Sequence, residues 1–208
     1  MLSTGQDQPG GLRERKKART RASIREHALR LFREQTYQGT TVEQIAAAAE
    51  VSPSTFFRYF PTKEDVVIQD DMDARLFAAF SRQPAGLAPV AAIRAALREV
   101  AASFSPVEWQ QLKEASELQL TVPEIRVRML DDLNRMILAM SEVLAKRTGR
   151  PSDDLAVRAF VGAAMGVMMS VAMPYHKTPE SPYGSVIETE MFDRMDEALA
   201  LLEAGLPL

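Results

Sequence analysis

One stretch, from Thr40 to Lys63, constrains the fold of this 208-residue chain more than any other. Thr40 or Thr41 can cap a short helix, because a Glu or a Gln stands three residues after each of them and completes a capping box. Apolar side chains then recur at helical spacing on one face, namely Val42, Ile45, Ala46 and Ala49. The pattern predicts a short amphipathic helix that is followed by a short break at Glu50 and Val51.

A second helix start follows at once. Ser52 is a good N-cap, and Pro53 takes the first helical position, where its missing N–H costs nothing. Pro61 then limits the helix to a few residues. Two short helices joined by a turn of about three or four residues form a helix-turn-helix, and the second helix of that motif enters a DNA major groove. A tight helical hairpin without any role in DNA binding is the plainer alternative.

The distribution of charge favours the DNA interpretation. The whole chain carries −3, yet the segment from Arg13 to Arg33 holds nine Arg or Lys against two Glu, a net charge of +7. A basic cluster on an acidic chain is the electrostatic mark of a surface that contacts DNA; a solvated charged tail is the alternative. We expect residues 1–19 to form a flexible basic arm that reaches phosphates or the minor groove.

These blocks together resemble the DNA-binding domain of TetR-type (TetR/AcrR) bacterial transcriptional repressors. The resemblance covers roughly residues 20–66, and its blocks are Ala28–Phe32, Thr41–Ala46, Val51–Phe60 and Lys63–Glu64. The family often has Gly where Glu50 and Ser54 stand, and it usually has Tyr in place of Phe57, with a hydroxyl that would contact a phosphate. The resemblance implies an all-α fold of about nine helices, with a three-helix DNA-binding domain at 20–66 and a ligand-binding and dimerisation domain at 67–208.

Within the helix-turn-helix, the residues expected to face the groove are Ser52, Ser54, Thr55, Arg58 and Tyr59. Thr41, Lys63 and the arm are expected to hold phosphates. The predicted DNA-binding residues are Arg19, Arg21, Thr40, Thr41, Ser52, Pro53, Ser54, Thr55, Phe57, Arg58, Tyr59 and Lys63.

Helix boundaries elsewhere follow from caps and breakers. We expect a first helix over about 20–35, closed by a left-handed Gly39, and a fourth helix that runs from Thr62 to about Phe80. Two further capping boxes occur at 105–108, with Pro106 at the first helical position, and at 121–124, and each predicts a helix start. The later helices are expected to end near Arg147, Met173 and Ala204, with a Pro-rich loop at 174–186.

The segment from Ala159 to Met173 carries no charge. Fifteen residues span about 22 Å, too short for a bilayer, so we expect a helix that is buried on every side. We interpret it, together with the last helix, as half of a homodimer interface built as a four-helix bundle, and the TetR resemblance implies the same. The predicted interface residues are Phe160, Ala163, Ala164, Val167, Val171, Met191, Met195, Ala198, Leu199 and Leu202. A monomer core helix is one alternative, and the docking surface of a helical adaptor for a protein partner is another.

Helices between 90 and 147 carry apolar residues that could line a pocket for an apolar ligand. They are Leu97, Phe104, Trp109, Leu112, Leu118, Met129, Leu133, Met136, Ile137 and Met140. Plain core packing is the alternative for each of them. The resemblance implies a small effector, and a similarity to actinobacterial members implies an acyl-CoA-like one. Polar groups that could orient such a ligand are Glu114, Glu117, Arg126, Arg128 and Asn134.

Several function classes find no support in the sequence. The chain has no cysteine, which excludes disulfides and thiolate metal sites. His27 and His176 are the only histidines and stand in no catalytic or metal-binding pattern, and we expect Asp131 and Asp132 on a solvated helix face. We therefore predict no enzyme, no metal and no cofactor.

The polar N-terminus predicts no signal peptide, a cytoplasmic location and no membrane partner. The sequence thus favours a ligand-responsive repressor that binds double-stranded operator DNA as a homodimer, and that a small apolar or acyl-CoA-like effector releases. The operator would be near-palindromic, with half-sites about 34–36 Å apart or a multiple of that distance.

Overall fold

The computed structural model describes residues 9–68, 70–172 and 189–207. The chain divides into two compact units, Met1–Ile68 and Gln69–Leu208. All regular elements among the described residues are helical, nine α-helices and one 3₁₀ turn, which confirms the predicted all-α fold class. His176, the predicted loop at 174–186 and the predicted helix end at Met173 lie outside the described residues.

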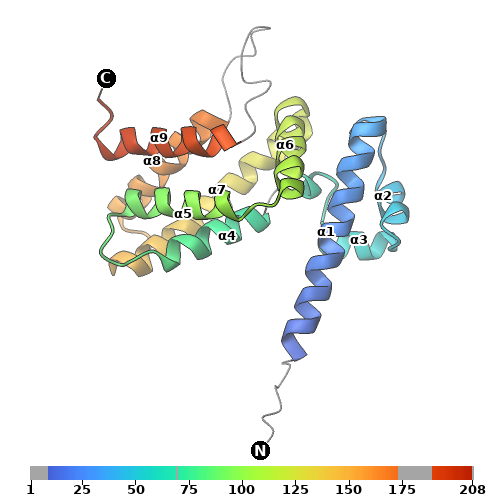
Figure 1. The fold of residues 1–208 in the computed structure, drawn as a ribbon, viewed down its shortest axis with the longest axis horizontal. Helices are drawn as coiled ribbons and strands as arrows, with labels where there is room; N and C mark the ends of the chain where they lie inside the picture. The colour runs from blue at the N-terminus through green and yellow to red at the C-terminus, as the bar shows by residue number, and fades with distance from the viewer. Residues whose placement is uncertain (1–8, 69, 173–188, 208) are drawn as a thin grey trace, which may run out of the picture. The chain divides into compact units, whose positions relative to one another are not determined.

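Residues 9–68 of the first unit form three α-helices and a 3₁₀ turn (Figure 1). They are α1 (Pro9–Gln35), α2 (Val42–Ala48), α3 (Pro53–Tyr59) and η1 (Glu64–Val66). A small core holds them together, because Ile24, Ile45, Phe56 and Phe60 are almost fully buried. The Phe56 and Phe60 rings lie 5.8 Å apart, so the inward face of α3 is aromatic. The outward face of α3 is thereby left for other contacts.

The start of α1 corrects one prediction. The helix begins at Pro9, so the expected flexible arm is helical from residue 9 onward. Leu, Arg, Glu, Lys and Ala fill most of residues 12–19, and all of them are good helix formers. They extend a helix that the buried residues Ile24, Ala28 and Phe32 already hold in place, so no separate nucleation is needed.

The turn after α1 corrects a second prediction. The residue with a left-handed backbone is Thr36, with φ of 68°, and Gly39 is not left-handed. Gly39 is required for another reason, since a Cβ at this position would collide with the backbone carbonyl oxygen of Gln35. The glycine allows close backbone approach, and not a special dihedral angle.

The predicted fourth helix does not run continuously from Thr62. Asp65 is buried, and its Oδ2 accepts hydrogen bonds from the backbone N–H and the hydroxyl of Thr62, both at 2.9 Å. Val66, Val67 and Ile68 are all buried in succession. Three consecutive buried positions do not fit a helix with one buried face, so the chain forms the short turn η1 and starts again as α4 (Asp70–Arg82).

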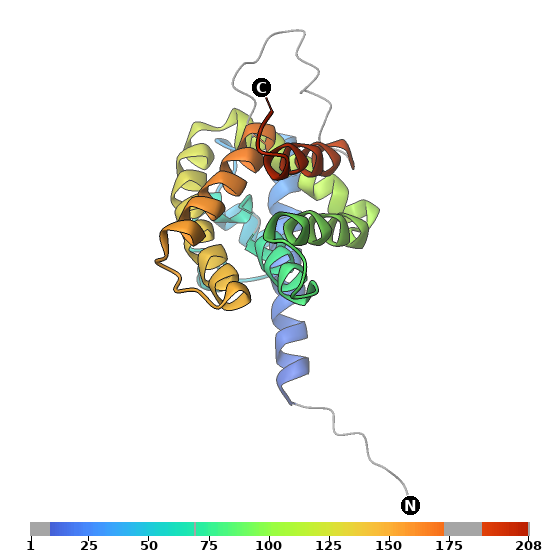
Figure 2. The same ribbon diagram turned by 90° about the vertical axis from the view of Figure 1, so that its left-hand side faces the viewer.

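The described residues of the second unit form a bundle of six helices (Figures 1 and 2). After α4 come α5 (Pro89–Ser103), α6 (Pro106–Thr121), α7 (Pro123–Thr148), α8 (Leu155–Ala172) and α9 (Thr189–Glu203). Helix α9 packs against α5 and α8, α4 packs against α5 and α7, and α7 also contacts α6 and α8. One apolar core runs through these contacts and includes Phe80, Ile93, Val161 and Leu199.

The two predicted capping boxes of this unit have different outcomes. At α6 the box is present, because Ser105 Oγ accepts from the backbone of Glu108 and the Glu108 carboxylate accepts from the backbone of Ser105. At α7 it is wrong. Thr121 is the last residue of α6, its hydroxyl donates to the carbonyl of Glu117, and Val122 is the N-cap. When a helix continues past a predicted N-cap, the hydroxyl of that residue can instead donate a hydrogen bond to a backbone carbonyl of the preceding turn.

Helix α8 is buried on one side within this chain, and not on every side as predicted. Its buried residues are Val157, Val161, Ala164, Met165 and Met168. Its exposed residues include Ala159, Gly162, Ala163, Gly166 and Ser170. By length and composition α8 is the one described helix that could cross a membrane, but core helices of other proteins pass the same test. Its buried face belongs to the core of the second unit.

Candidate functional site

Two local caps fix α2 and α3 in the first unit. The hydroxyl of Thr41 accepts the backbone N–H of Gln44 at 3.2 Å, and the Gln44 side-chain oxygen accepts the backbone N–H of Thr41 at 2.8 Å. At α3 the Ser52 hydroxyl accepts the backbone N–H of Thr55 at 3.1 Å, with Pro53 at the first helical position. Both predicted helix starts are confirmed, and each cap is made by side chains within the helix-turn-helix itself.

The turn between these helices contains one unusual backbone conformation. Glu50 has φ of 55°, a left-handed value that L-residues adopt at a cost. Its neighbour Val51 then donates a backbone hydrogen bond to the carbonyl of Ala46 at 2.9 Å, which closes α2. This position is where TetR-type sequences often have Gly, and the left-handed turn gives the physical reason. The Glu50 side chain is exposed to solvent.

The outward face of α3 is polar at its start and carries Arg58 near its end. Ser52, Ser54 and Arg58 are exposed, and Thr55 and Tyr59 are half-buried. Hydrogen bonds link the three hydroxyls at the start of α3, because Ser52 Oγ lies 2.9 Å from Ser54 Oγ and donates to Thr55 Oγ1 at 3.0 Å. Such groups can donate to or accept from base edges, and a guanidinium can bind guanine with two hydrogen bonds.

Phe57 adds an apolar group to the same face. Half of its surface is exposed, although it is a large aromatic residue. Its ring meets the buried Phe56 ring edge-on at 5.5 Å, which fixes its direction. Pro53 is exposed as well. The resemblance predicted both residues at a DNA surface, and both lie on the outward side of α3.

Thr40 and Lys63 have structural partners inside the first unit. Thr40 is 1% exposed, and its hydroxyl donates to the carbonyl of Thr36 at 2.8 Å. The Lys63 ammonium donates to the carbonyls of Tyr37 and Thr40, at 2.9 and 3.0 Å, and lies 4.0 Å from the Tyr37 ring centroid. The ammonium therefore links η1 to the turn after α1, and the phosphate contact of the half-buried Lys63 side chain stays a prediction.

Arg21 is likewise engaged within the unit. Its Nη1 donates to the backbone carbonyl of Tyr59 at 2.9 Å, and its guanidinium lies 4.4 Å from the Phe60 ring centroid. The side chain therefore ties α1 to the C-terminal end of α3. Arg19, two residues earlier, is exposed, as is Thr41. Sequence reasoning had no signal for this role, since 38 residues separate Arg21 from Tyr59.

The predicted pocket residues gather in the second unit, mostly as core. Three of them, Leu97, Leu112 and Met140, are buried, and five pack half-buried against the same cluster: Phe104, Trp109, Leu133, Met136 and Ile137. Leu118 and Met129 are half-buried outside that cluster.

An aromatic group in this core was only partly predicted. Trp109 lies 5.1 Å from Phe104 and 5.4 Å from Phe192, measured between ring centroids. Phe192 belongs to α9 and was missed, although it is the one aromatic residue in the sequence of the last helix. The group connects the start of α6 with α9.

Asp132 departs from its prediction. Its side chain is buried rather than on a solvated face, whereas its neighbour Asp131 is exposed. It forms an ion pair with Arg135 one turn later. Asp132 lies seven residues after the buried Ile125, on the same side of α7, so a carboxylate stands on an otherwise apolar helix face.

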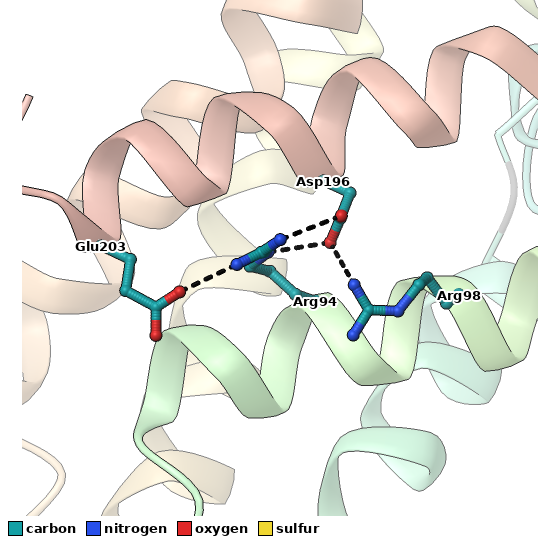
Figure 3. Close-up of polar contacts among 4 residues, drawn as sticks. All are labelled: Arg94, Arg98, Asp196 and Glu203. Atoms are coloured by element: carbon teal, nitrogen blue, oxygen red, sulfur yellow. Dashed lines mark hydrogen bonds and ion pairs between the residues drawn. The ribbon is translucent and has the colours of Figure 1, made fainter.

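A cluster of ion pairs joins α5 to α9 (Figure 3). Arg94 binds both carboxylate oxygens of Asp196, at 2.9 and 3.1 Å, and also binds Glu203 at 2.9 Å. Arg98 reaches the same Asp196 at 2.9 Å. The hydrogen bond from Arg94 outweighs the desolvation of Asp196, so its pKa lies below the ordinary aspartate value. These contacts fix α9 against α5.

The predicted dimer residues divide into two groups. Ala164 and Leu199 are buried in the core of their own unit, so they present no surface to a partner. The other eight are exposed or half-buried on α8 and α9: Phe160, Ala163, Val167, Val171, Met191, Met195, Ala198 and Leu202. Packing of α8 on α9 in the monomer accounts for the burial of the first group.

Two family models match most of the chain. Residues 24–69 match the model described as bacterial regulatory proteins, tetR family, and residues 87–207 match the MftR C-terminal domain. Over 151 residues the chain is 36% identical to the HTH-type transcriptional regulator TcmR of Streptomyces glaucescens. The aligned region covers 69% of this chain and 67% of TcmR.

Solved structures share the fold. Thermus thermophilus FadR, a TetR-family transcriptional repressor in complex with lauroyl-CoA, is 26% identical with a TM-score of 0.53, and the match covers 90% of this chain and 95% of FadR. The fatty acid degradation regulator FadR of Bacillus halodurans is 22% identical with a TM-score of 0.54, over 90% and 96% of the two chains. The second likeness shows the fold alone.

Proposed function

Since this chain belongs to the TetR family of bacterial transcriptional regulators, we propose that it is a repressor that binds operator DNA as a homodimer and is released by a small apolar effector. The observation that carries the proposal is the outward face of α3, where the exposed hydroxyls of Ser52 and Ser54 and the guanidinium of Arg58 point away from an aromatic core. A surface of this chemistry is suited to base edges in a major groove.

DNA contacts divide by chemistry. Ser54, Thr55 and Arg58 contact bases, because they can form specific hydrogen bonds at the start and along the side of α3. Thr41 and Ser52 lie at helix N-termini, where backbone N–H groups favour phosphates. Thr40 and Lys63 are also predicted at the DNA surface; because their side chains have partners within the unit, we assign them a supporting role in this surface.

The homodimer uses the exposed small-residue side of α8. Ala159, Gly162, Ala163 and Gly166 leave room for a second helix to approach closely, and Phe160 and Val167 flank them as half-buried apolar groups. A two-fold axis would relate two copies of α3, so the operator would be near-palindromic, with half-sites about 34–36 Å apart or a multiple of that distance.

The effector binds in the second unit. FadR of Thermus thermophilus, at 26% identity, is in complex with lauroyl-CoA, which supports an apolar or acyl-CoA-like ligand here. Trp109 contacts Phe192 of α9, so a ligand that displaces Trp109 acts on a helix of the proposed dimer. Effector binding would favour a dimer conformation that no longer fits the operator. A repressor of this kind works in the cytoplasm.

A helical adaptor that docks a protein partner on α8 is the other candidate class. The exposed side of α8 is compatible with it, but it assigns no role to the polar face of α3. The two classes differ in one simple observable, namely binding to duplex DNA.

The test is a titration of the protein against two labelled duplexes of equal length, the promoter fragment adjoining its own gene and a random sequence. Arg58→Ala should lower affinity for the promoter by about 1–3 kcal/mol and leave affinity for random DNA nearly unchanged, if Arg58 reads a base. Arg98→Ala, which removes an exposed cation from the second unit, should bind both duplexes as the wild type does. An equal loss on both duplexes would reassign Arg58 to a phosphate, and wild-type protein that binds neither duplex at low salt would refute the proposal.

A further inference from the structure

The N-terminal part of α1 has no structural partner in its unit. Every residue from Gly11 to Arg19 is exposed, and among the described residues of the first unit no other element lies beside this part of the helix (Figures 1 and 2). The match to the tetR family model begins only at residue 24. This exposed segment, Gly11 to Arg19, is the extension of α1, and it lies before the part of the chain that the family model matches.

The extension carries many charges, and nearly all of them are positive. Against the single acid Glu14 it carries five cations: Arg13, Arg15, Lys16, Lys17 and Arg19. Within the described residues, Arg15 binds only the carbonyl of Gly11, and the charged groups of the other four have neither an ion pair nor a hydrogen bond. Cations four residues apart, such as Arg13 and Lys17, repel each other along a helix. A ligand with regularly spaced negative charges would relieve this repulsion.

Its position is set by Arg21. Because the Arg21 guanidinium holds the carbonyl of Tyr59 and lies over the Phe60 ring, the extension leaves the unit beside the C-terminal end of α3. The eight residues from Arg21 back to Arg13 span about 12 Å of helix. The exposed cations thus begin next to the proposed DNA-reading helix and continue away from it.

We propose that the exposed end of α1, from Gly11 to Arg19, is a second DNA contact that lies along the phosphates of the duplex beside the segment reached by α3. This inference rests on the proposed function, and it extends the contact beyond the helix-turn-helix. Each strand of duplex DNA carries about one negative charge per 3.4 Å of the axis, so a rigid helix of about 12 Å that lies along one strand reaches about two to four phosphates.

The helical form changes the kind of DNA contact that the sequence predicted. An α-helix with its side chains is about 10–12 Å across, and the minor groove of B-DNA is only about 6 Å wide. A helical extension therefore stays outside the minor groove and contacts the backbone. It adds affinity that depends on salt and not on sequence.

A membrane surface is a poorer match for the same charges. Helices that bind at a membrane surface place an apolar face in the lipid. Only Leu12 and Ala18 are apolar between residues 11 and 19, and their separation of six puts them on different sides of the helix. The extension offers charge without an apolar face, which suits a polyanion in water.

The test compares two full-length variants in which four cations are changed together. The neutral variant is Arg13→Gln, Lys16→Gln, Lys17→Gln and Arg19→Gln; the charge-keeping control is Arg13→Lys, Lys16→Arg, Lys17→Arg and Arg19→Lys. Gln, Lys and Arg are all good helix formers, so α1 is retained in both, and circular dichroism verifies this. The probes are the promoter fragment, a random duplex of equal length and vesicles that contain phosphatidylserine.

For the neutral variant we expect weaker binding to both duplexes by the same factor. The slope of log K against log salt, between about 50 and 200 mM, should become shallower by about 0.9 for each phosphate that the variant no longer neutralises, thus by about 2–4. The control should match the wild type in affinity and slope. Unchanged affinity and slope in the neutral variant would overturn the inference. So would a loss confined to vesicle binding, which would assign the extension to membranes.

The design separates this inference from the proposed function. If the wild type binds the promoter and Arg58→Ala abolishes its preference over random DNA, while the neutral variant behaves as wild type, only the role of the extension fails. If the wild type binds neither duplex, both the repressor and the second contact are refuted.

Discussion

Arg94 and Asp196, which are 102 residues apart in the chain, form an ion pair with two hydrogen bonds of 2.9 and 3.1 Å that joins α5 to α9. The side chains are 25% and 21% exposed, so solvent screens them only partly. Since α9 packs on both α5 and α8, this pair helps to set the position of a helix that we place in the dimer interface. The ion pair is therefore a direct target for mutation.

Arg94→Met should lower the free energy of unfolding of the second unit by about 1–3 kcal/mol, because it keeps an apolar stem and leaves the Asp196 carboxylate without its main donor. The single tryptophan, Trp109, lies against Phe192 of α9 and reports on this unit by its fluorescence during urea unfolding. Arg98→Met is the matched control. Arg98 is 58% exposed, so the loss there should be about 0.5 kcal/mol or less, and equal losses would contradict this assignment.

The same pair predicts a pH dependence. The hydrogen bond from Arg94, with a further contribution from the charge of Arg98, holds the pKa of Asp196 below its ordinary 3.8 despite desolvation. A carboxyl with a lowered pKa in the folded state stabilises the protein above the unfolded-state pKa, and this stabilisation is lost as the pH falls through the folded-state value. The stability difference between wild type and Arg94→Met should stay constant down to about pH 4 and then shrink. Urea titrations from about pH 6 to about pH 3 measure it; a difference that grows in acid would be inconsistent with the pair.

Glu50 offers a test of the turn in the helix-turn-helix. Its φ of 55° is disfavoured for a residue with a side chain, so Glu50→Gly should stabilise the first unit by up to about 1 kcal/mol. Ala49, the preceding residue, has an ordinary φ of −86°, and Ala49→Gly should destabilise the unit by about 1 kcal/mol instead. Amide hydrogen exchange in α2 and α3 reads both changes. The interpretation of the turn would be wrong if the two glycines acted in the same direction.

Phe57 lacks the hydroxyl that the TetR resemblance associates with a phosphate contact. Because half of its surface is exposed, Phe57→Tyr can add that hydroxyl without disturbing the core. We expect binding to both promoter and random duplexes to tighten by about 0.5–1.5 kcal/mol, the usual value of one added hydrogen bond. Phe57→Leu, which stays apolar, should show no gain. Tightening on the promoter alone would indicate a base contact instead.

Local rules predicted the helix starts well. The caps Thr41–Gln44 and Ser105–Glu108 involve side chains only three residues apart, so their geometry is fixed by the sequence nearby. The N-cap Ser52 followed by Pro53 belongs to the same class. The order of helices and the helix-turn-helix could therefore be predicted without a structure.

The partners of charged side chains could not be predicted in this way. Arg21 and Lys63 are predicted as DNA-binding residues from their charge, but the sequence does not show the carbonyls of Tyr59 and Tyr37 that they bind across the unit. Asp132 looked solvated for a similar reason, although its position on α7 matches the buried Ile125. These roles depend on contacts between helices, which no local pattern encodes.

A competition titration decides whether the outward face of α3 reads duplex DNA. Wild-type protein is bound to a labelled promoter fragment at about 0.15 M salt, and unlabelled promoter or a base-shuffled duplex of the same composition displaces it. We expect the promoter to compete at least about 10³-fold better than the shuffled duplex, as specific sites do in DNA-binding proteins. Equal competition by both duplexes, or no binding of the promoter in the first place, would contradict it.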